Sequence, residues 1–147
     1  MQVTRATDYA VRVLVYLAGL PAGANVRRSE IAKATDAPES FLSKVLQQLV
    51  QARMISSQRG SGGGFRLAMA SEQVSLLDVV EAIEGPTRLN ACMEPGPSCN
   101  RKNWCGAHSV WVEAQAALEQ VLRGATVAEM ARRSAEAVAS QEGKQQG

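Results

Sequence analysis

Three cysteines are the residues of this sequence most capable of specific chemistry. Cys92, Cys99 and Cys105 lie in one stretch, with six and five residues between them. Thiolate sulfur is the usual ligand of iron–sulfur clusters and a common ligand of zinc. Structural zinc sites usually pair ligands about two to four residues apart, and no cysteine pair has that spacing here. Wide spacing in a Gly/Pro-containing loop favours an iron–sulfur cluster, with zinc or three redox-active thiols as alternatives.

Three thiolates leave one ligand position for a different donor. His108, the only histidine of the chain, follows Cys105 by three residues, and Asp8 is a second candidate from an early helix. Each has an ordinary alternative role, because His108 can cap a helix start and Asp8 is a favourable charge near a helix N-terminus. A nitrogen or oxygen ligand would make the centre easier to open, which suits a sensor.

A basic N-terminal half precedes the cysteines. Residues 5–66 hold nine Lys or Arg side chains and four acidic ones, although the whole chain has a formal net charge of +2. Cations gathered in one region suit the phosphate backbone of DNA, whose contacts supply most of the non-specific affinity. A positive face that is simply solvated is the alternative explanation.

Hydrophobic spacing predicts three helices in this basic half. The first begins near Thr7, which we expect to cap it, and presents one apolar face. The second covers about 28–35, and the third opens at Pro38 and runs to about Ala52. A tight turn at residues 36–37 joins the second helix to the third. Two short helices connected in this way are the helix-turn-helix pattern.

A β-hairpin follows the helix-turn-helix. Residues 54–57 and 65–67 predict two short strands around a glycine-rich turn, which makes the hairpin a wing. The glycine run 60–64 lacks the Lys-Ser/Thr of a phosphate-binding loop, so a nucleotide site is excluded. In such folds the start of the second helix of the helix-turn-helix, here the helix that opens at Pro38, reaches base edges. The wing reaches the DNA backbone or the minor groove. The candidate DNA-binding residues are therefore Arg28, Glu39, Ser40, Phe41, Ser43, Lys44 and Arg59.

The C-terminal half predicts a loop between helices. A fourth helix spans 76–84 behind a capping box at Ser75 and Asp78, and Thr126 caps a last helix. Between them, a long helix from His108 carries an apolar stripe that needs a partner. Pairing with a second copy into a homodimer is the commonest solution, and packing on its own domain is the alternative. We therefore divide the chain into a DNA-binding domain (1–86), a cysteine-bearing loop (87–107), a dimerisation helix with a C-terminal helix (108–139) and a disordered tail (140–147).

Several function classes find no support. Paired carboxylates, a nucleophile–base set and cofactor fingerprints are absent, so we do not expect an enzyme. No apolar run approaches the roughly 20 residues that a membrane span needs, and no signal peptide is visible. We expect a cytoplasmic protein, where disulfides are rare and clustered cysteines point to metal or reactive thiols.

The combined pattern resembles the Rrf2 family of bacterial transcription regulators, which includes the IscR, NsrR and RirA types. The resemblance rests on TDYAVR at 7–12, FLSKVL at 41–46, RGSGGGF at 59–65 and the cysteine loop, and covers about residues 1–135. It implies a mainly α fold with a small β-hairpin wing, in which a winged helix-turn-helix precedes a long dimerisation helix. It also implies a homodimer that binds a double-stranded DNA operator.

The resemblance further implies a cofactor. Cysteine-bearing members hold a [2Fe–2S] or [4Fe–4S] cluster, with Cys92, Cys99 and Cys105 as ligands. His108 matches the histidine ligand of the IscR type, and Asp8 matches the aspartate that the NsrR type supplies from the other protomer. We therefore expect a regulator, such as a repressor, whose operator affinity depends on a cluster that senses nitric oxide, redox chemistry or iron supply. A zinc- or thiol-based redox regulator of the same fold is the alternative.

Overall fold

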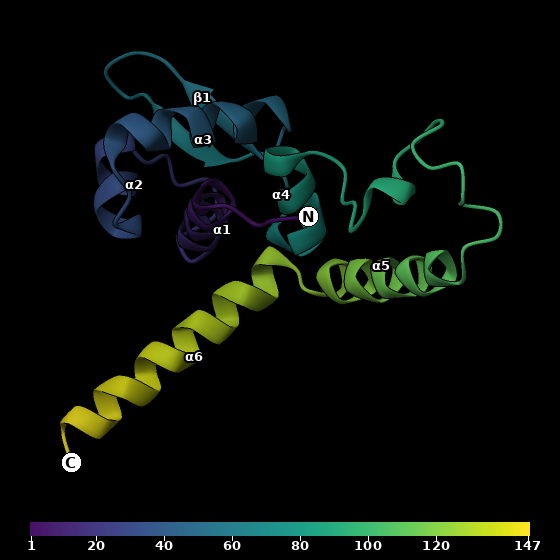
Figure 1. The fold of residues 1–147 in the computed structure, drawn as a ribbon. Coiled ribbons are helices and arrows are strands. Elements are labelled where there is room, and N and C mark those ends of the chain that lie inside the picture. The colour runs from purple at the N-terminus through teal and green to yellow at the C-terminus, as the bar shows by residue number, and fades with distance from the viewer.

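Helix α1 (Arg5–Ala18) lies at the centre of the N-terminal domain in the computed structural model, which describes residues 1–147. Its apolar residues recur at helical spacing, so Ala10, Val13 and Leu14 share one face and are completely buried. The helices α2, α3, α4 and the start of α6 all contact α1 (Figure 1). The remaining elements of the domain are therefore oriented by this one helix.

Helices α2 (Arg28–Thr35) and α3 (Glu39–Gln51) form the helix-turn-helix. The turn between them depends on Asp36, whose φ of +54° is a left-handed conformation that ends α2. Pro38 directly precedes the first residue of α3. The inward face of α3 holds the predicted apolar stripe, which comprises Leu42, Val45, Leu46 and Leu49. The predicted helix-turn-helix is confirmed.

Strands β1 (Ile55–Gln58) and β2 (Gly64–Leu67) pair antiparallel as the predicted wing. Val26, from the segment before α2, adds a bridge at the outer side of β2. Its backbone N–H donates to the Phe65 carbonyl at 2.8 Å, and the Phe65 N–H donates to the Val26 carbonyl at 2.7 Å. The wing is thereby fastened to the helix-turn-helix.

Helix α4 (Leu76–Glu84) begins with the predicted capping box, in which Ser75 and Asp78 exchange hydrogen bonds. The prediction that Thr7 caps the first helix is wrong. Helix α1 begins at Arg5 and Thr7 is buried within it, because a carboxylate from the end of α4 supplies the cap instead. Glu84 accepts hydrogen bonds from the Thr4 backbone N–H at 2.9 Å and from the Thr4 and Thr7 hydroxyls at 2.6 Å each.

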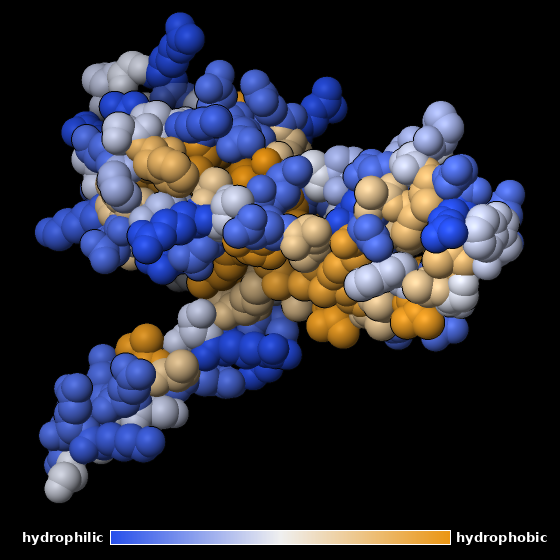
Figure 2. Space-filling view, viewed as in Figure 1, coloured by the Kyte–Doolittle hydropathy of each residue, from blue (hydrophilic) through white to orange (hydrophobic).

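Helix α5 (Gly106–Gly124) packs on α4, and α6 (Val127–Gln145) starts on α1 before extending away from the domain (Figure 1). Of the stripe predicted for the long helix, Gln115 is buried, whereas Trp111 and Val121 are 39% and 70% exposed. Figure 2 shows hydrophobic surface along α5. The apolar face of α5 is therefore left without a partner inside the chain. No helix is long and apolar enough to cross a membrane.

The disordered tail predicted from Ser140 is wrong, because α6 continues to Gln145. Two features favour the helical state along the exposed length of α6. Arg132 forms ion pairs with Glu129 and Glu136, one turn before and after it, and Arg133 pairs with Glu129. The composition of the segment, rich in Ala, Glu and Gln, adds high helix propensity.

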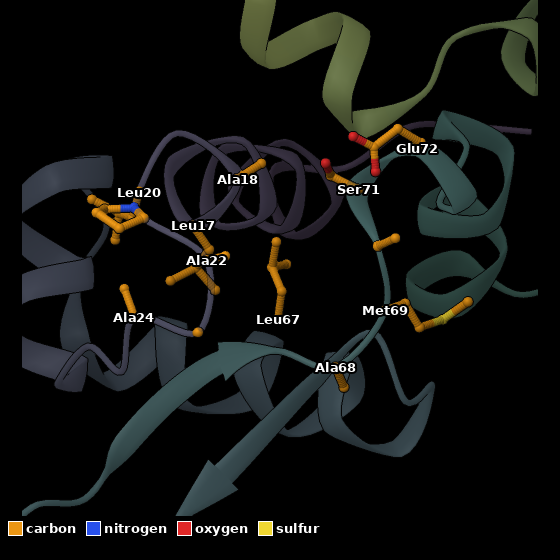
Figure 3. Close-up of a pocket in the computed structure, with 13 residues that line it drawn as sticks. Leu17, Ala18, Leu20, Ala22, Ala24, Leu67, Ala68, Met69, Ser71 and Glu72 are labelled. Atoms are coloured by element: carbon orange, nitrogen blue, oxygen red, sulfur yellow. The ribbon is translucent and has the colours of Figure 1, made fainter.

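A hollow of about 470 Å³, with both polar and apolar surface, lies between the end of α1 and the segment that follows β2 (Figure 3). Figure 3 shows Leu17, Leu67 and Met69 among its lining residues. The cysteine loop and α3 contribute no residue to it. This hollow is therefore separate from both regions that the sequence singled out.

Gly64 provides a test of how the wing is fastened. A Cβ at this position would lie 2.5 Å from the Val26 carbonyl oxygen and would force the bridge apart, whereas a Cβ on Gly62 would meet nothing within 4 Å. We expect Gly64→Ala to lower the free energy of unfolding by about 1–3 kcal/mol and Gly62→Ala to leave it nearly unchanged. Urea unfolding measures both, and equal stability of the two variants would contradict the close approach.

The cap on α1 predicts a pH dependence. Burial raises the pKa of the Glu84 carboxyl, whereas hydrogen bonds from Thr4 and Thr7 lower it. Together the hydrogen bonds have the larger effect, so the pKa of Glu84 lies below the ordinary 4.5. A lowered folded-state pKa contributes stability above the unfolded value, and this stability is lost as the pH falls through the folded value. We expect Glu84→Gln to be less stable than the wild type at pH 7, with the difference shrinking on acidification below about 4.5. A difference that is constant from pH 7 to 3 in urea titrations would rule this out.

Candidate metal centre and nucleic-acid interface

The three cysteines line one cavity of about 330 Å³ beside the start of α5. Cys92 lies in the short helix η2 (Ala91–Met93), and Cys105 directly precedes α5. Cys99 comes from the loop between them, which turns back to the start of α5 (Figure 1). All three thiols are half-buried and none forms a disulfide. The other lining residues are Asn90, Ala91, Ser98, Lys102, Ala107, His108 and Trp111.

His108 joins the cysteines, and Asp8 does not. The first turn of α5 carries His108 back toward η2, so its Nδ1 atom lies 3.5 Å from the Sγ atom of Cys92. Asp8 lies on α1, where its carboxylate pairs with Arg12 at 2.8 Å, and it does not line the cavity. Within one chain, the nitrogen donor is therefore the one that borders the same space as the thiols.

The side chains around the cavity are of types that bind metal centres. No three His, Cys, Asp or Glu side chains come close enough to one another to bind one metal ion. Three thiols and one imidazole nevertheless border a common cavity. Cysteine thiolates and a histidine nitrogen are ligand types used by iron–sulfur clusters and by zinc. The residues present therefore fit an iron–sulfur cluster.

The start of the cysteine loop is bound to three elements of the fold. The Leu89 N–H donates to the side-chain oxygen of Gln115 on α5 at 3.3 Å. The Thr87 N–H donates to Glu81 on α4, and the Met1 ammonium group donates to the Arg88 carbonyl at 2.9 Å. Sequence reasoning missed this junction. The one feature of the sequence that could have indicated the junction is Gln115, a polar residue within the apolar stripe of the long helix.

The predicted DNA-binding residues form an exposed surface at the start of α3 and on the wing. Glu39, Ser40 and Lys44 are exposed there, as is Arg59 on the wing. Phe41 is 41% exposed, and its ring meets the Tyr9 ring edge-on with centroids 5.5 Å apart. Part of its side chain therefore packs against α1.

A groove of about 350 Å³ separates α3 from the wing. Arg28, Ser43 and Arg59, which are three of the predicted residues, line it, and the Arg28 guanidinium donates to the Ser43 hydroxyl at 3.0 Å. Gln47 and Gln58 also line the groove but were not predicted. Gln47 could have been found, because it lies one helical turn after Ser43.

Two side chains from the segment before α2 hold the wing tip. The Asn25 amide donates to the Gly62 carbonyl at 2.7 Å, and the Arg27 guanidinium donates to the Ser61 carbonyl at 3.4 Å. Gly63 has no room for a Cβ, which would lie 2.3 Å from the Gln58 carbonyl oxygen. The wing tip that carries Arg59 is thus held beside α3 by hydrogen bonds between distant segments, which local sequence patterns do not predict.

A helix-turn-helix with a braced wing and a long exposed helix defines a winged-helix transcription regulator. The family model described as "Rrf2: Iron-dependent Transcriptional regulator" matches residues 3–133. The chain therefore belongs to the Rrf2 family, whose members are DNA-binding transcriptional regulators and not enzymes.

Relatives agree with this assignment. Protein aau3 of Rhizobium meliloti is 36% identical over 129 residues, which cover 86% of this chain and 82% of the relative. An HTH-type transcriptional regulator of Mycobacterium tuberculosis, Rv1287, is 30% identical over 131 residues, which cover 89% and 81%.

Solved structures share the fold. CymR, the global cysteine regulator of B. subtilis, has a TM-score of 0.73 at 20% identity and covers 90% of this chain and 98% of its own. T. potens IscR has a TM-score of 0.73 at 24% identity and covers 93% and 90%. The predicted fold, mainly α with a β-hairpin wing and a long helix, is confirmed.

Gln47 allows a test of the groove with a control on the same helix. A glutamine amide can pair with a base edge, so we expect Gln47→Ala to weaken specific binding by about 1–3 kcal/mol. Gln51 is exposed on α3 but lies outside the groove, so Gln51→Ala should bind normally. Fluorescence anisotropy with duplexes selected from a random-sequence library, compared with unselected DNA, measures both. Equal effects of the two variants would exclude base contact through the groove.

Proposed function

We propose that this protein is a homodimeric transcription regulator whose operator affinity is controlled by an iron–sulfur cluster. The observation that carries the proposal is the single cavity lined by Cys92, Cys99, Cys105 and His108. Three thiolates and one imidazole form a mixed donor set known for iron–sulfur chemistry. When bound, such a cluster supplies one-electron redox chemistry and reactivity toward nitric oxide and oxygen.

The chain's own residues would hold the centre and carry its state outward. Cys92, Cys99 and Cys105 are the proposed ligands, and His108 is favoured as the fourth because of its contact with Cys92. Asp8 of a second protomer is the other candidate. Since Cys92 lies three residues after Leu89, a change in its position would act on the junction that binds α4, α5 and the N-terminus.

A continuous set of contacts leads from that junction to α3, the helix whose start is predicted to contact DNA bases. The junction comes directly after the end of helix α4. At that end, the Ile83 carbonyl accepts a hydrogen bond from Gln48 on α3 at 3.3 Å. Glu84 at the same end of α4 caps α1. Occupancy of the cysteine cavity would therefore bias how α3 is presented to DNA, provided that this end of α4 has two arrangements.

A second copy completes the DNA-binding unit in this proposal. The exposed apolar face of α5 includes Val110, Trp111 and Val121, and surface of this kind marks a protein interface. Two-fold pairing would present two α3 helices to half-sites about one helical turn apart on the duplex. A small rotation between protomers would then change the affinity for the operator strongly. A change in the cysteine cavity could therefore have a large effect on DNA binding.

The test is to purify the protein without air from iron-replete cells. We expect visible absorption, iron and sulfide, and we expect operator affinity to differ between loaded and stripped protein in an electrophoretic shift. Alanine variants of Cys92, Cys99 and Cys105 should lose the colour, and His108→Ala and Asp8→Ala assign the fourth ligand.

Colourless protein that binds its operator fully would refute the cluster proposal. Zinc in place of iron, or operator binding that depends on thiol oxidation alone, would support the zinc- or thiol-based alternative. Normal regulation in all three cysteine variants would exclude both.

A further inference from the structure

Lys102 is the one Lys or Arg side chain that lines the cysteine cavity. It lies midway between Cys99 and Cys105 and is half-buried. No carboxylate pairs with it, because every ion pair of the chain uses Arg12, Arg132 or Arg133. The cavity is therefore bordered by a lysine side chain that has no anionic partner.

The surrounding loop does not supply the missing anion. Within residues 87–107 the cations are Arg88, Arg101 and Lys102, and the one carboxylate, Glu94, does not line the cavity. Arg101 differs from its neighbour, because its guanidinium lies 4.9 Å from the centroid of the exposed Trp104 ring and outside the cavity. Of the two adjacent cations, Lys102 is thus the one in a position to meet the contents of the cavity.

We propose that Lys102 is the counter-cation of the cysteine cavity and raises the reduction potential of an anionic metal centre held there. This rests on the proposed cluster function. Three thiolates bring three negative charges, and one-electron reduction by an external reductant adds another without breaking a bond. A nearby fixed positive charge stabilises the more negative state more strongly. The charge of Arg101, facing solvent, is screened by water and salt.

The first experiment is a potentiometric titration of the cluster-loaded protein with dithionite. We expect Lys102→Gln to lower the midpoint potential and Lys102→Arg to stay near the wild type. Arg101→Gln removes the same charge from the adjacent residue and should also stay near the wild type. An unchanged potential in Lys102→Gln, or an equal shift in Arg101→Gln, would overturn the proposal.

A second experiment needs no metal. In stripped, reduced protein, the alkylation rates of the three cysteines are compared for iodoacetate, an anion, and iodoacetamide, which is neutral. The same thiolate attacks both reagents and displaces iodide from each, so their rate ratio at one pH reports the local charge rather than thiol ionisation or access. We expect the iodoacetate-to-iodoacetamide ratio to fall several-fold in Lys102→Gln and to persist in Lys102→Arg and Arg101→Gln.

The two experiments separate the two proposals. An unchanged alkylation ratio in Lys102→Gln overturns the role of Lys102 whether or not the protein carries iron. A reduced ratio supports Lys102 as the cation of the cavity even in a preparation without iron, where the cluster proposal itself would fail.

Discussion

The burial of one face of helix α1 is the constraint on which the other surfaces of this protein depend. Ala10, Val13 and Leu14 are completely buried where α2, α3, α4 and α6 meet. Burying a Val or Leu side chain contributes about 1.5–3 kcal/mol, so this contact outweighs any single surface interaction. Because α3 must turn its leucines toward α1, its opposite face, with Lys44 and Gln47, is left exposed.

The cysteine region is held in a different way. Its thiols are only half-buried, and the start of its loop is fixed mainly by hydrogen bonds to α4, α5 and the N-terminus rather than by an apolar core. Regions with few buried apolar contacts open at lower cost than the core. This division suits the proposed function, since the proposed centre can rearrange at low cost beside a firmly packed DNA-binding domain.

The wing and the cysteine loop are both positioned by close contacts with neighbouring segments rather than by a large buried core. Gly64 lets the hairpin backbone touch Val26, where a side chain would collide with the carbonyl oxygen. At the other end of the molecule, His108 comes within 3.5 Å of Cys92 because the first turn of α5 packs under η2. In each case a short segment is positioned by its neighbours, and the residues of interest project from it.

Local patterns in the sequence were sufficient for the helices, the hairpin, the capping box at Ser75 and the grouping of the cysteines. These features depend on residue spacing and type within a few positions, and the resulting elements were predicted to within a few residues. The extent of the last helix was missed, because the polar composition of residues 140–147 predicted disorder, whereas α6 continues to Gln145.

The tertiary structure alone decided which distant residues meet. Glu84 caps a helix that begins about 80 positions earlier, His108 rather than Asp8 borders the cysteine cavity within one chain, and Gln115 anchors the cysteine loop. Such contacts follow from how whole helices pack against each other. A one-dimensional pattern does not specify that packing, since the apolar faces of α1 and α4 indicate only that each helix is covered and not by which partner.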